Sequence, residues 1–353
     1  MKGCVVALDN IGGRAAAARL IDGRLEDFLI DPAPDMAPAA EAIFRAVVDR
    51  QMKGQGGVFL KLPGNLSAFL KQAAGLAPGQ RLLVQVTGHA EGGKAVPVST
   101  RLLFKSRYAI VTPGAPGLNI SRRIREGSEQ ERLTAVAQAG MAGASEAVGL
   151  ILRSACAEAT DAAIAQDIAL MRNLAEAVLA DADGPPELLV DAPGAHDVAW
   201  RDWVDPVPDE VADRAGAFRD HGVADRLDAL LDAVVPLGAG ASMVIEPTRA
   251  LVAVDVNTGP DTSPAAGLKA NTAAARDLPR QLRLRGLGGQ ITLDFAPMPK
   301  KDRAVLEQVL RAAFRNEGSE TTLAGWTPLG NYEIQRKRDR APLTVALKGA
   351  ASA

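Results

Sequence analysis

The sequence predicts a mixed α/β (α+β) protein with more than one domain. Its 353 residues are enough for two or three domains. Short β-branched runs bounded by polar or glycine residues, such as Val148–Leu152, alternate with longer amphipathic stretches, such as residues 159–181. The chain is 47% hydrophobic and 23% charged, which is typical of a globular protein with a sizeable core.

Charge and cysteine content narrow the class of protein. The formal net charge is −2, so any nucleic-acid-binding surface must be a local basic patch. With only Cys4 and Cys156, the chain has no disulfide framework and no cysteine-rich zinc site. The first residues form too short an apolar run for a signal peptide, and no run approaches the roughly 20 apolar residues of a membrane span. We therefore expect a cytoplasmic protein with no membrane association.

The amino-terminal third is predicted to be rich in strands. Residues 3–9, 15–21 and 25–30 form an antiparallel meander with a hairpin turn at Asp22 and Gly23. After this meander, further short strands are separated by loops rich in Gly, Pro and Lys, which is typical of a small barrel. These barrel strands are predicted at residues 42–48, 57–62, 81–87 and 95–99.

Two phenylalanines in this barrel region are candidates for binding nucleic acid. Phe59 and Phe69 lie ten residues apart, among several basic residues that include Lys94. Single-stranded nucleic acid requires aromatic rings for base stacking and cations for its phosphates. The alternative is that both phenylalanines belong to the core and the lysines form an ordinary surface.

A cluster of arginines follows the next predicted strand. Ser121, Arg122, Arg123 and Arg125 form either a phosphate-binding group or a solvated turn, and the local sequence leaves both open. Further along, the strand Val148–Leu152 leads directly to Arg153 and Ser154, so polar groups stand at its carboxyl end.

Two carboxylates follow apolar strands in the last third. Asp255 ends the run 251–255, and Asp294 ends the run 288–294. Neighbouring strands would bring the two side chains together as a site for Mg²⁺, which takes one or two carboxylates and leaves its other positions to water and phosphate. The alternative is that each Asp only caps a loop.

The remaining segments of the last third are predicted as a loop and two helices. Residues 236–241 are predicted as a loop, and residues 268–285 as a helix whose last part is markedly basic. Asp302 is expected to cap a second helix that ends at Phe314.

Four stretches of the sequence resemble the bacterial ribonuclease E/G family. Residues 250–258 (ALVAVDVNT) and 291–295 (ITLDF) are similar to the segments of the family that carry its catalytic aspartates. Residues 280–289 (RQLRLRGLGG) nearly repeat a family signature, and residues 120–124 (ISRRI) match another. The resemblance covers nearly the whole chain and is weaker towards the amino terminus.

The resemblance implies a specific architecture. A ribonuclease-H-like subdomain would contain an inserted OB-fold RNA-binding barrel, and a deoxyribonuclease-I-like catalytic subdomain would follow. The expected parts are residues 1–35 (ribonuclease-H-like, first part), 36–107 (OB-fold), 108–184 (5′-phosphate sensor-like), 185–235 (ribonuclease-H-like, second part) and 236–347 (catalytic).

The resemblance also implies a reaction. The chain would be an endoribonuclease that cuts single-stranded RNA with Mg²⁺ and leaves 5′-phosphate and 3′-hydroxyl ends. Asp255 and Asp294 would hold the metal, and Asn257 would orient a carboxylate or the scissile phosphate.

The family's other functional positions can be placed on this chain. Phe59 and Phe69 fall at positions where the family stacks RNA bases, which favours their functional interpretation. Arg153 and Ser154 fall where the family binds the 5′-monophosphate of its substrate. The expected RNA-binding set is Phe59, Phe69, Lys94, Arg122 and Arg123.

The chain departs from the family pattern in several places. No cysteine follows Cys156, so the zinc-linked dimer of longer members is not expected. Pro297 replaces a second acidic residue, and no clear counterpart completes the 5′-phosphate pocket, although Thr321 lies near that position. Two alternatives therefore stay open, namely a non-catalytic RNA-binding protein of the same family and a metallophosphodiesterase that also acts on DNA.

Overall fold

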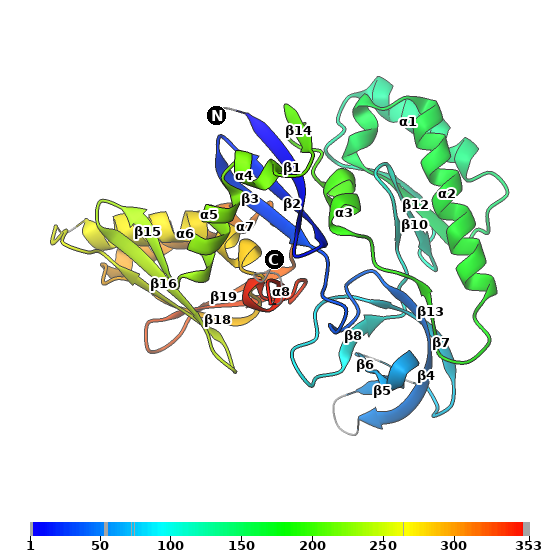
Figure 1. Ribbon diagram of the computed structural model, residues 1–353, viewed down its shortest axis with the longest axis horizontal. Coiled ribbons are helices and arrows are strands. Elements are labelled where there is room, and N and C mark those ends of the chain that lie inside the picture. The colour runs from blue at the N-terminus through cyan, green and yellow to red at the C-terminus, as the bar shows by residue number, and fades with distance from the viewer. Residues whose placement is uncertain (1–2, 53–55, 72, 74, 264, 349–353) are drawn as a thin grey trace. The chain divides into compact units, whose positions relative to one another are not determined.

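The computed structural model describes residues 3–52, 56–71, 73, 75–263 and 265–348 (Figure 1). The chain divides into two compact units. The first comprises Met1–Ala33 together with Val211–Ala353, and the second comprises Pro34–Glu210. The second unit is therefore inserted between two parts of the first, and each unit is described by itself.

The first unit begins with the predicted antiparallel meander. Strands β1 (Cys4–Ile11), β2 (Arg14–Ile21) and β3 (Arg24–Ile30) pair in sequence order. Between β2 and β3, Asp22 and Gly23 have φ angles of 49° and 75°. Two consecutive positive φ angles are typical of a two-residue hairpin turn.

The returning chain completes this small sheet. Strand β14 (Glu210–Asp213) adds to the edge of β1. Helices α4 (Ala217–Asp220) and α5 (Val223–Leu231) bury apolar side chains against the meander. The amide of Phe218 donates a hydrogen bond of 3.0 Å to the Asp9 carboxylate. Segments from both ends of the sequence therefore share one core.

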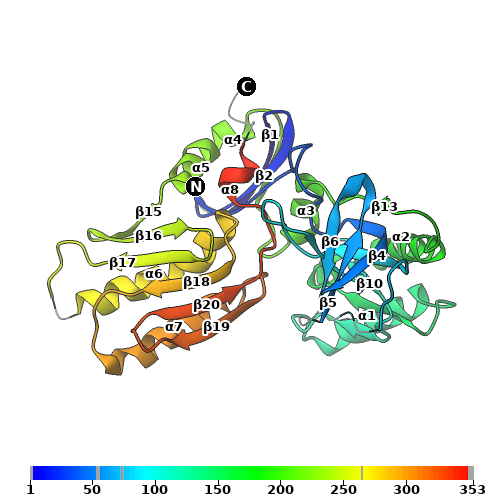
Figure 2. The same ribbon diagram turned by 90° about the horizontal axis from the view of Figure 1, so that it is seen from below.

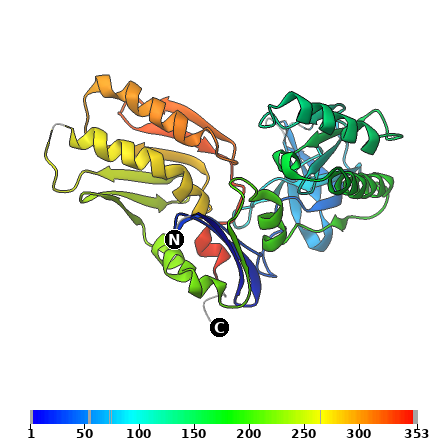
Figure 3. The ribbon, with the colours of Figure 1, turned by 90° about the horizontal axis from the view of Figure 1, so that it is seen from above.

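The rest of the first unit is a six-stranded sheet with two helices on one face (Figures 2 and 3). Its order is β15-β16-β17-β18-β20-β19, and every neighbouring pair is antiparallel except β17 and β18. Parallel neighbours need a long crossover, which helix α6 supplies. The elements are β15 (Val234–Gly238), β16 (Ala241–Pro247), β17 (Val252–Asn257), α6 (Ala266–Leu284), β18 (Gly289–Asp294), α7 (Arg303–Phe314), β19 (Thr321–Trp326), β20 (Tyr332–Arg336) and the short α8 (Leu343–Ala346).

The second unit contains the predicted barrel. Five strands close on themselves in the order β4-β5-β6-β8-β7, because β7 also pairs with β4. This closed five-stranded barrel is consistent with an OB-fold. Strand β13 (Glu187–Val190) pairs with β4 outside the closed ring. The barrel strands are β4 (Ile43–Met52), β5 (Gly57–Lys61), β6 (Ser67–Leu70), β7 (Arg81–Val86) and β8 (Val96–Ser99).

A four-stranded sheet and two helices form the other part of the second unit. The strand order is β11-β12-β10-β9, and α1 and α2 pack against this sheet to form one core. Helix α2 begins at an N-cap, where the Thr160 hydroxyl accepts a hydrogen bond from the Ala163 amide. The elements are β9 (Phe104–Lys105), β10 (Ala109–Pro113), β11 (Leu118–Ile120), α1 (Gly127–Gly140), β12 (Val148–Leu152), the 3₁₀ turn η2 (Ser154–Glu158) and α2 (Asp161–Ala180). A further helix of the second unit, α3 (Ala195–Asp202), follows β13.

The mixed α/β class is confirmed, and two local predictions are wrong. Residues 236–241 were expected to form a loop, but β15 extends to Gly238 because its backbone pairs with β16. Asp302 does not cap α7 through its side chain. A 3₁₀ turn, η3 (Lys300–Asp302), leads directly into the helix, so Asp302 itself has helical φ and ψ angles of −83° and −12°.

The finer likenesses to ribonuclease H and deoxyribonuclease I stay predictions, as do the domain boundaries drawn from them. Among the described residues, we find no helix with both the length and the apolar character to cross a membrane.

A partly buried ion pair joins β3 to the carboxyl-terminal segment of the first unit. The Asp27 side chain is 13% exposed and accepts hydrogen bonds from the Arg340 guanidinium and, at 2.9 Å, from the Phe28 amide. Arg283 lies 3.9 Å away. Burial alone would raise the pKa of Asp27, but Arg340 and Arg283 outweigh it and lower the pKa below its ordinary value.

We predict that this pair makes stability depend on pH below about 4. The folded pKa of Asp27 lies below its unfolded value of about 3.9, so the stabilisation is complete above that pH and is lost as the pH falls through the folded pKa. Asp27→Asn should lower the free energy of unfolding by about 2 kcal/mol at pH 7, less than for a fully buried pair because Arg340 is one-third exposed.

Urea unfolding at pH 7 and pH 3 measures this effect. The difference between wild type and Asp27→Asn should shrink at pH 3, whereas the exposed control Asp228→Asn should change little at either pH. An equal difference at both pH values would contradict the assignment.

Candidate active site

The two aspartates predicted to form a site lie directly opposite each other. Strands β17 and β18 pair in parallel, and Asp255 is the register partner of Asp294. Asp294 is the last residue of β18, and Asp255 lies two residues before the end of β17, so both stand near the carboxyl ends of adjacent strands. Like charges directly opposite each other in a sheet are destabilising, so this arrangement costs stability unless a cation compensates it.

The aspartates lie on the face of the sheet opposite the helices. Alternate residues such as Val254 and Leu293 are buried in the core with α6 and α7. The intervening Asp255, Asn257 and Asp294 are exposed to solvent. The strands are thus buried on one face only. The register of the strands, rather than burial, brings the two aspartates together.

Asn257 supports one of the two carboxylates. Its side-chain Nδ2 donates a hydrogen bond of 2.8 Å to Asp255 Oδ2. Asn257 and Asp255 are two residues apart on one strand, so both side chains point to the same face. Asn257 therefore restricts the rotation of the Asp255 carboxylate.

The donor set fits a hard cation that keeps open coordination positions. Within the described ranges, no group of three or more His, Cys, Asp or Glu side chains could hold a metal ion. A pair of exposed carboxylates cannot enclose an ion. It could hold Mg²⁺, which commonly takes one or two carboxylates and completes its shell with water and substrate phosphate.

A buried asparagine positions the segment that follows Asp294. Asn271, on α6, is fully buried and bonds both backbone groups of Ala296 at 2.9 Å, once as donor and once as acceptor. The same helix approaches closely at Gly267, where a Cβ atom would lie 2.0 Å from the Pro297 carbonyl oxygen. Sequence reasoning missed Asn271, although a polar residue in the apolar stripe of a helix could have indicated it.

The two candidate phenylalanines lie outside the core of the barrel. Phe59 on β5 and Phe69 on β6 are register partners, and their ring centroids are 5.3 Å apart. Both are half-buried, whereas their neighbours Val58 and Leu60 are buried in the barrel. The Arg50 guanidinium lies 4.7 Å from the Phe59 ring centroid. This arrangement contradicts the alternative that the rings are core and leaves an aromatic pair beside a cation.

The other expected RNA-binding residues lie at exposed positions of the second unit. Lys94 is exposed and forms an ion pair with Glu91. Arg122 and Arg123 lie in the turn after β11, where the buried Ile124 anchors the backbone. Arg123 forms a 2.7 Å ion pair with Asp205. Ion pairs of this exposed kind contribute little to stability and can open to bind phosphate.

Arg153 is already paired with a carboxylate. Its guanidinium donates to Asp202 Oδ1 at 2.6 Å and to the carbonyl oxygen of Ser106 at 2.7 Å. Ser154, the first residue of η2, is half-buried beside it. Asp202 therefore already pairs with the guanidinium that was expected to bind a 5′-phosphate. Nothing in the sequence indicated that Asp202 would be this partner.

Asp202 belongs to a larger charged network. Arg201 bonds Asp202 at 2.8 Å and Glu41 at 2.6 Å, and Lys105 bonds Glu41 at 3.0 Å. Burial would raise the pKa of both carboxyls, but hydrogen bonds and charges from the neighbouring cations, chiefly Arg201, lower it below the ordinary value. Both carboxylates are therefore ionised at neutral pH, and Arg153 stays paired.

Comparison with known proteins matches this chain to one family and to several of its members. The sequence profile of the Ribonuclease E/G family matches residues 104–213 and 208–339. Ribonuclease E of Nostoc sp. (strain PCC 7120) is 28% identical over 364 residues, covering 89% of this chain and 51% of that protein. Ribonuclease G of Salmonella typhimurium (strain SL1344) is 30% identical over 304 residues, covering 74% and 60%. Ribonuclease G of Escherichia coli (strain K12) is 30% identical over 310 residues, covering 76% and 62%. The chain thus spans about half to three-fifths of the length of these relatives.

We predict that Asn271 is required for the local structure behind the carboxylates. Asn271→Ala would leave two buried backbone groups of Ala296 without partners, at about 1–3 kcal/mol each. The free energy of unfolding should therefore fall by about 2–4 kcal/mol, measured by urea denaturation. The matched control Gln290→Ala, at an exposed position of β18, should change it by less than about 0.5 kcal/mol. Equal effects of the two substitutions would contradict this role.

Proposed function

The chain belongs to the ribonuclease E/G family, and we propose that it is a Mg²⁺-dependent endoribonuclease acting on single-stranded RNA. The observation that carries the proposal is the register of β17 and β18, which places Asp255 opposite Asp294 on an open face of the sheet. Two carboxylates at an exposed position leave room for an RNA phosphate beside them. The names of its relatives, ribonuclease E and ribonuclease G, support RNA as the class of substrate.

Asp255 and Asp294 would hold the metal, and Asn257 would keep the Asp255 carboxylate in place through its 2.8 Å hydrogen bond. When bound, the ion supplies positive charge for the scissile phosphate and an activated water as the nucleophile, which yields 5′-phosphate and 3′-hydroxyl ends. The protein groups contribute orientation. The helix contact through Asn271 fixes the segment after Asp294, so the second carboxylate has a defined backbone position.

The aromatic pair on the barrel would bind the RNA strand. Phe59 and Phe69 present rings on the outer face of adjacent strands, and Arg50 adds a cation at 4.7 Å. Unpaired bases can stack on such rings, whereas bases within a duplex cannot reach them. This favours a single-stranded substrate.

A 5′-phosphate would have to compete with a carboxylate of the protein itself. Arg153 is the expected phosphate ligand, but Asp202 already accepts its guanidinium at 2.6 Å. A phosphate could share this guanidinium, which has several donors, or replace Asp202. We therefore propose that 5′-end binding at this position is weak.

The second candidate function is RNA binding without cleavage. Two observations favour it. Over the described part of the chain, only two carboxylates stand at the proposed site. In addition, Pro297 stands where the family has another acidic residue. Cleavage and binding assays in the presence and absence of metal separate the two functions.

We predict that Asp294→Asn abolishes cleavage and leaves RNA binding intact. The substitution removes one of the two charges that would hold the cation, and the exposed position tolerates the isosteric amide. The measurement is a cleavage time course on a 5′-monophosphorylated single-stranded RNA with Mg²⁺ or EDTA. The expected loss is at least about 10³-fold in rate, which corresponds to roughly 4 kcal/mol of transition-state stabilisation.

The exposed substitution Asp225→Asn on α5 is the matched control and should cut RNA like wild type. Full activity of Asp294→Asn, or cutting in EDTA, would rule out the metal site. Binding without cutting in every lane, wild type included, would establish the second function.

We predict that Phe59→Ala weakens RNA binding by about 1–3 kcal/mol, the usual loss for one stacked base. Fluorescence anisotropy with a labelled single-stranded RNA in EDTA measures affinity without cleavage. Leu66→Ala, which removes an exposed apolar side chain from the same barrel, is the control and should leave the affinity unchanged. Equal affinities of all three proteins would show that RNA does not stack on Phe59.

A further inference from the structure

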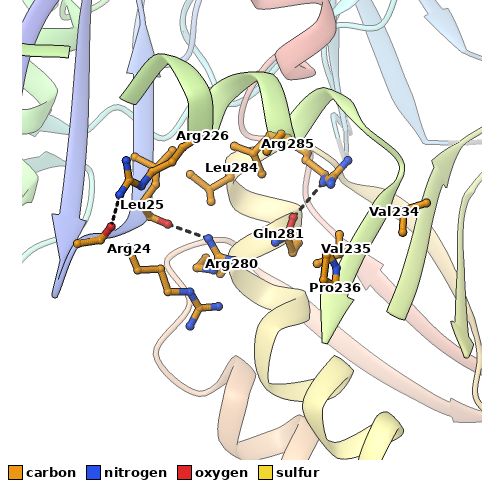
Figure 4. Close-up of a pocket in the computed structure, with 13 residues that line it drawn as sticks. Arg24, Leu25, Arg226, Val234, Val235, Pro236, Arg280, Gln281, Leu284 and Arg285 are labelled. Carbon is orange, nitrogen blue, oxygen red and sulfur yellow. Dashed lines mark hydrogen bonds between the residues drawn. The ribbon is translucent and has the colours of Figure 1, made fainter. Parts of the chain in front are cut away.

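A cavity of about 380 Å³ lies within the first unit (Figure 4), and neither Asp255 nor Asp294 is among its lining residues. It is lined by the turn between β2 and β3, by α5, by β15 and by the last turns of α6. Its volume falls in the range of roughly 300–1,000 Å³ that is usual for small-molecule sites. The lining turns of α6 begin nine residues beyond Asn271, about 14 Å along the helix, so the cavity is separate from the proposed active site.

The cavity combines an apolar floor with four arginines. Leu25, Leu230, Val235 and Leu284 are buried residues that contribute to its wall. Around them stand the guanidinium groups, which come from three different elements (Figure 4). The four arginines are Arg24, Arg226, Arg280 and Arg285.

Two of these arginines have carboxylate partners and two do not. Arg24 and Arg280 share the Asp277 carboxylate, which lies 2.7 Å from Arg280.

Arg226 donates instead to the carbonyl oxygens of His221, Gly222 and Gly23. Arg285 donates to Gln281 Oε1 at 3.1 Å and to the Asp232 carbonyl oxygen at 2.7 Å. Over the described residues, no ion pair compensates Arg226 or Arg285.

Arg285 makes this excess of charge costly. Its side chain is only 7% exposed, and its hydrogen bonds go to neutral oxygens, so its buried charge has no carboxylate in direct contact. Burial, together with the nearby Arg280, lowers the pKa of Arg285, although Asp232 and Asp277 act in the opposite direction. An anion in the cavity would relieve this cost.

We propose that the cavity binds a small phosphate monoester with an apolar body, the chemistry of a 5′-mononucleotide. The phosphate would meet Arg226 and Arg285, since guanidinium groups match phosphate oxygens in charge and geometry. The base would lie against the apolar floor. The ligand could be a free nucleotide or the terminal nucleotide of an RNA, and the proposal does not depend on cleavage activity.

The test is isothermal titration of the full chain with AMP in EDTA, so that no metal-dependent binding contributes. AMP should bind at one site with a Kd of roughly 1 mM or below. Adenosine, which lacks the phosphate, should not bind, and inorganic phosphate, which lacks the apolar body, should bind about tenfold more weakly. The 5′-phosphorylated dinucleotide pApA shows whether an RNA end is accepted as well as the free nucleotide.

Two substitutions place the binding in the cavity. Arg226→Gln removes an unpaired charge, and Ala229→Phe fills the space from the exposed side of α5 without removing a hydrogen bond. Each should weaken AMP binding at least about tenfold. Arg153→Gln, which alters the expected phosphate site of the second unit, is the matched control and should leave this site unchanged.

No saturable AMP binding by wild type up to about 10 mM, or wild-type affinity for AMP in both cavity variants, would overturn the proposal. Loss of binding only in Arg153→Gln would assign the phosphate to the second unit and would also overturn it. If the loss of its three carbonyl contacts prevents Arg226→Gln from folding, Ala229→Phe alone decides the outcome.

Discussion

The parallel pairing of β17 and β18 is the constraint on which the first unit depends. A parallel pair requires a crossover, and α6 meets this need by covering one face of the sheet with its apolar side. The opposite face stays open, and there Asp255 and Asp294 stand side by side. The packing energy of the covered face thus holds two like charges together on the open one, and this repulsion is what a bound cation would offset.

The basic signature at the end of α6 has a structural role that its composition does not suggest. Arg280 donates to the carbonyl oxygen of Leu25, and Arg283 donates to that of Glu26. Arg285 reaches the carbonyl oxygen of Asp232. These contacts join the meander and the end of α5 to the six-stranded sheet within one unit. A run of arginines in a family of RNA-binding proteins therefore need not face RNA. Arg280 and Arg285, which make two of these contacts, also line the cavity.

Polar side chains that act through other residues were the least predictable from the sequence. Asn271 acts on Ala296, which is 25 positions away, and Asp202 pairs with Arg153 across 49 positions. Neither pair has a local pattern, because its geometry depends on how two elements dock. Strands were easier to predict, because apolar and polar residues alternate along consecutive positions around Phe59 and Val254. The expected cap at Asp302 failed because a 3₁₀ turn precedes the helix.

By itself, the sequence determined the mixed α/β class, the amino-terminal meander, the barrel region and the two strands that carry Asp255 and Asp294, because hydrophobic periodicity and turn residues act locally. It also identified the family through the order of its motifs. Only the tertiary structure decided that Asp255 and Asp294 are exposed register partners, that Phe59 and Phe69 lie outside the barrel core and that Arg153 is held by Asp202. These facts depend on strand register and on contacts between distant segments, which packing selects.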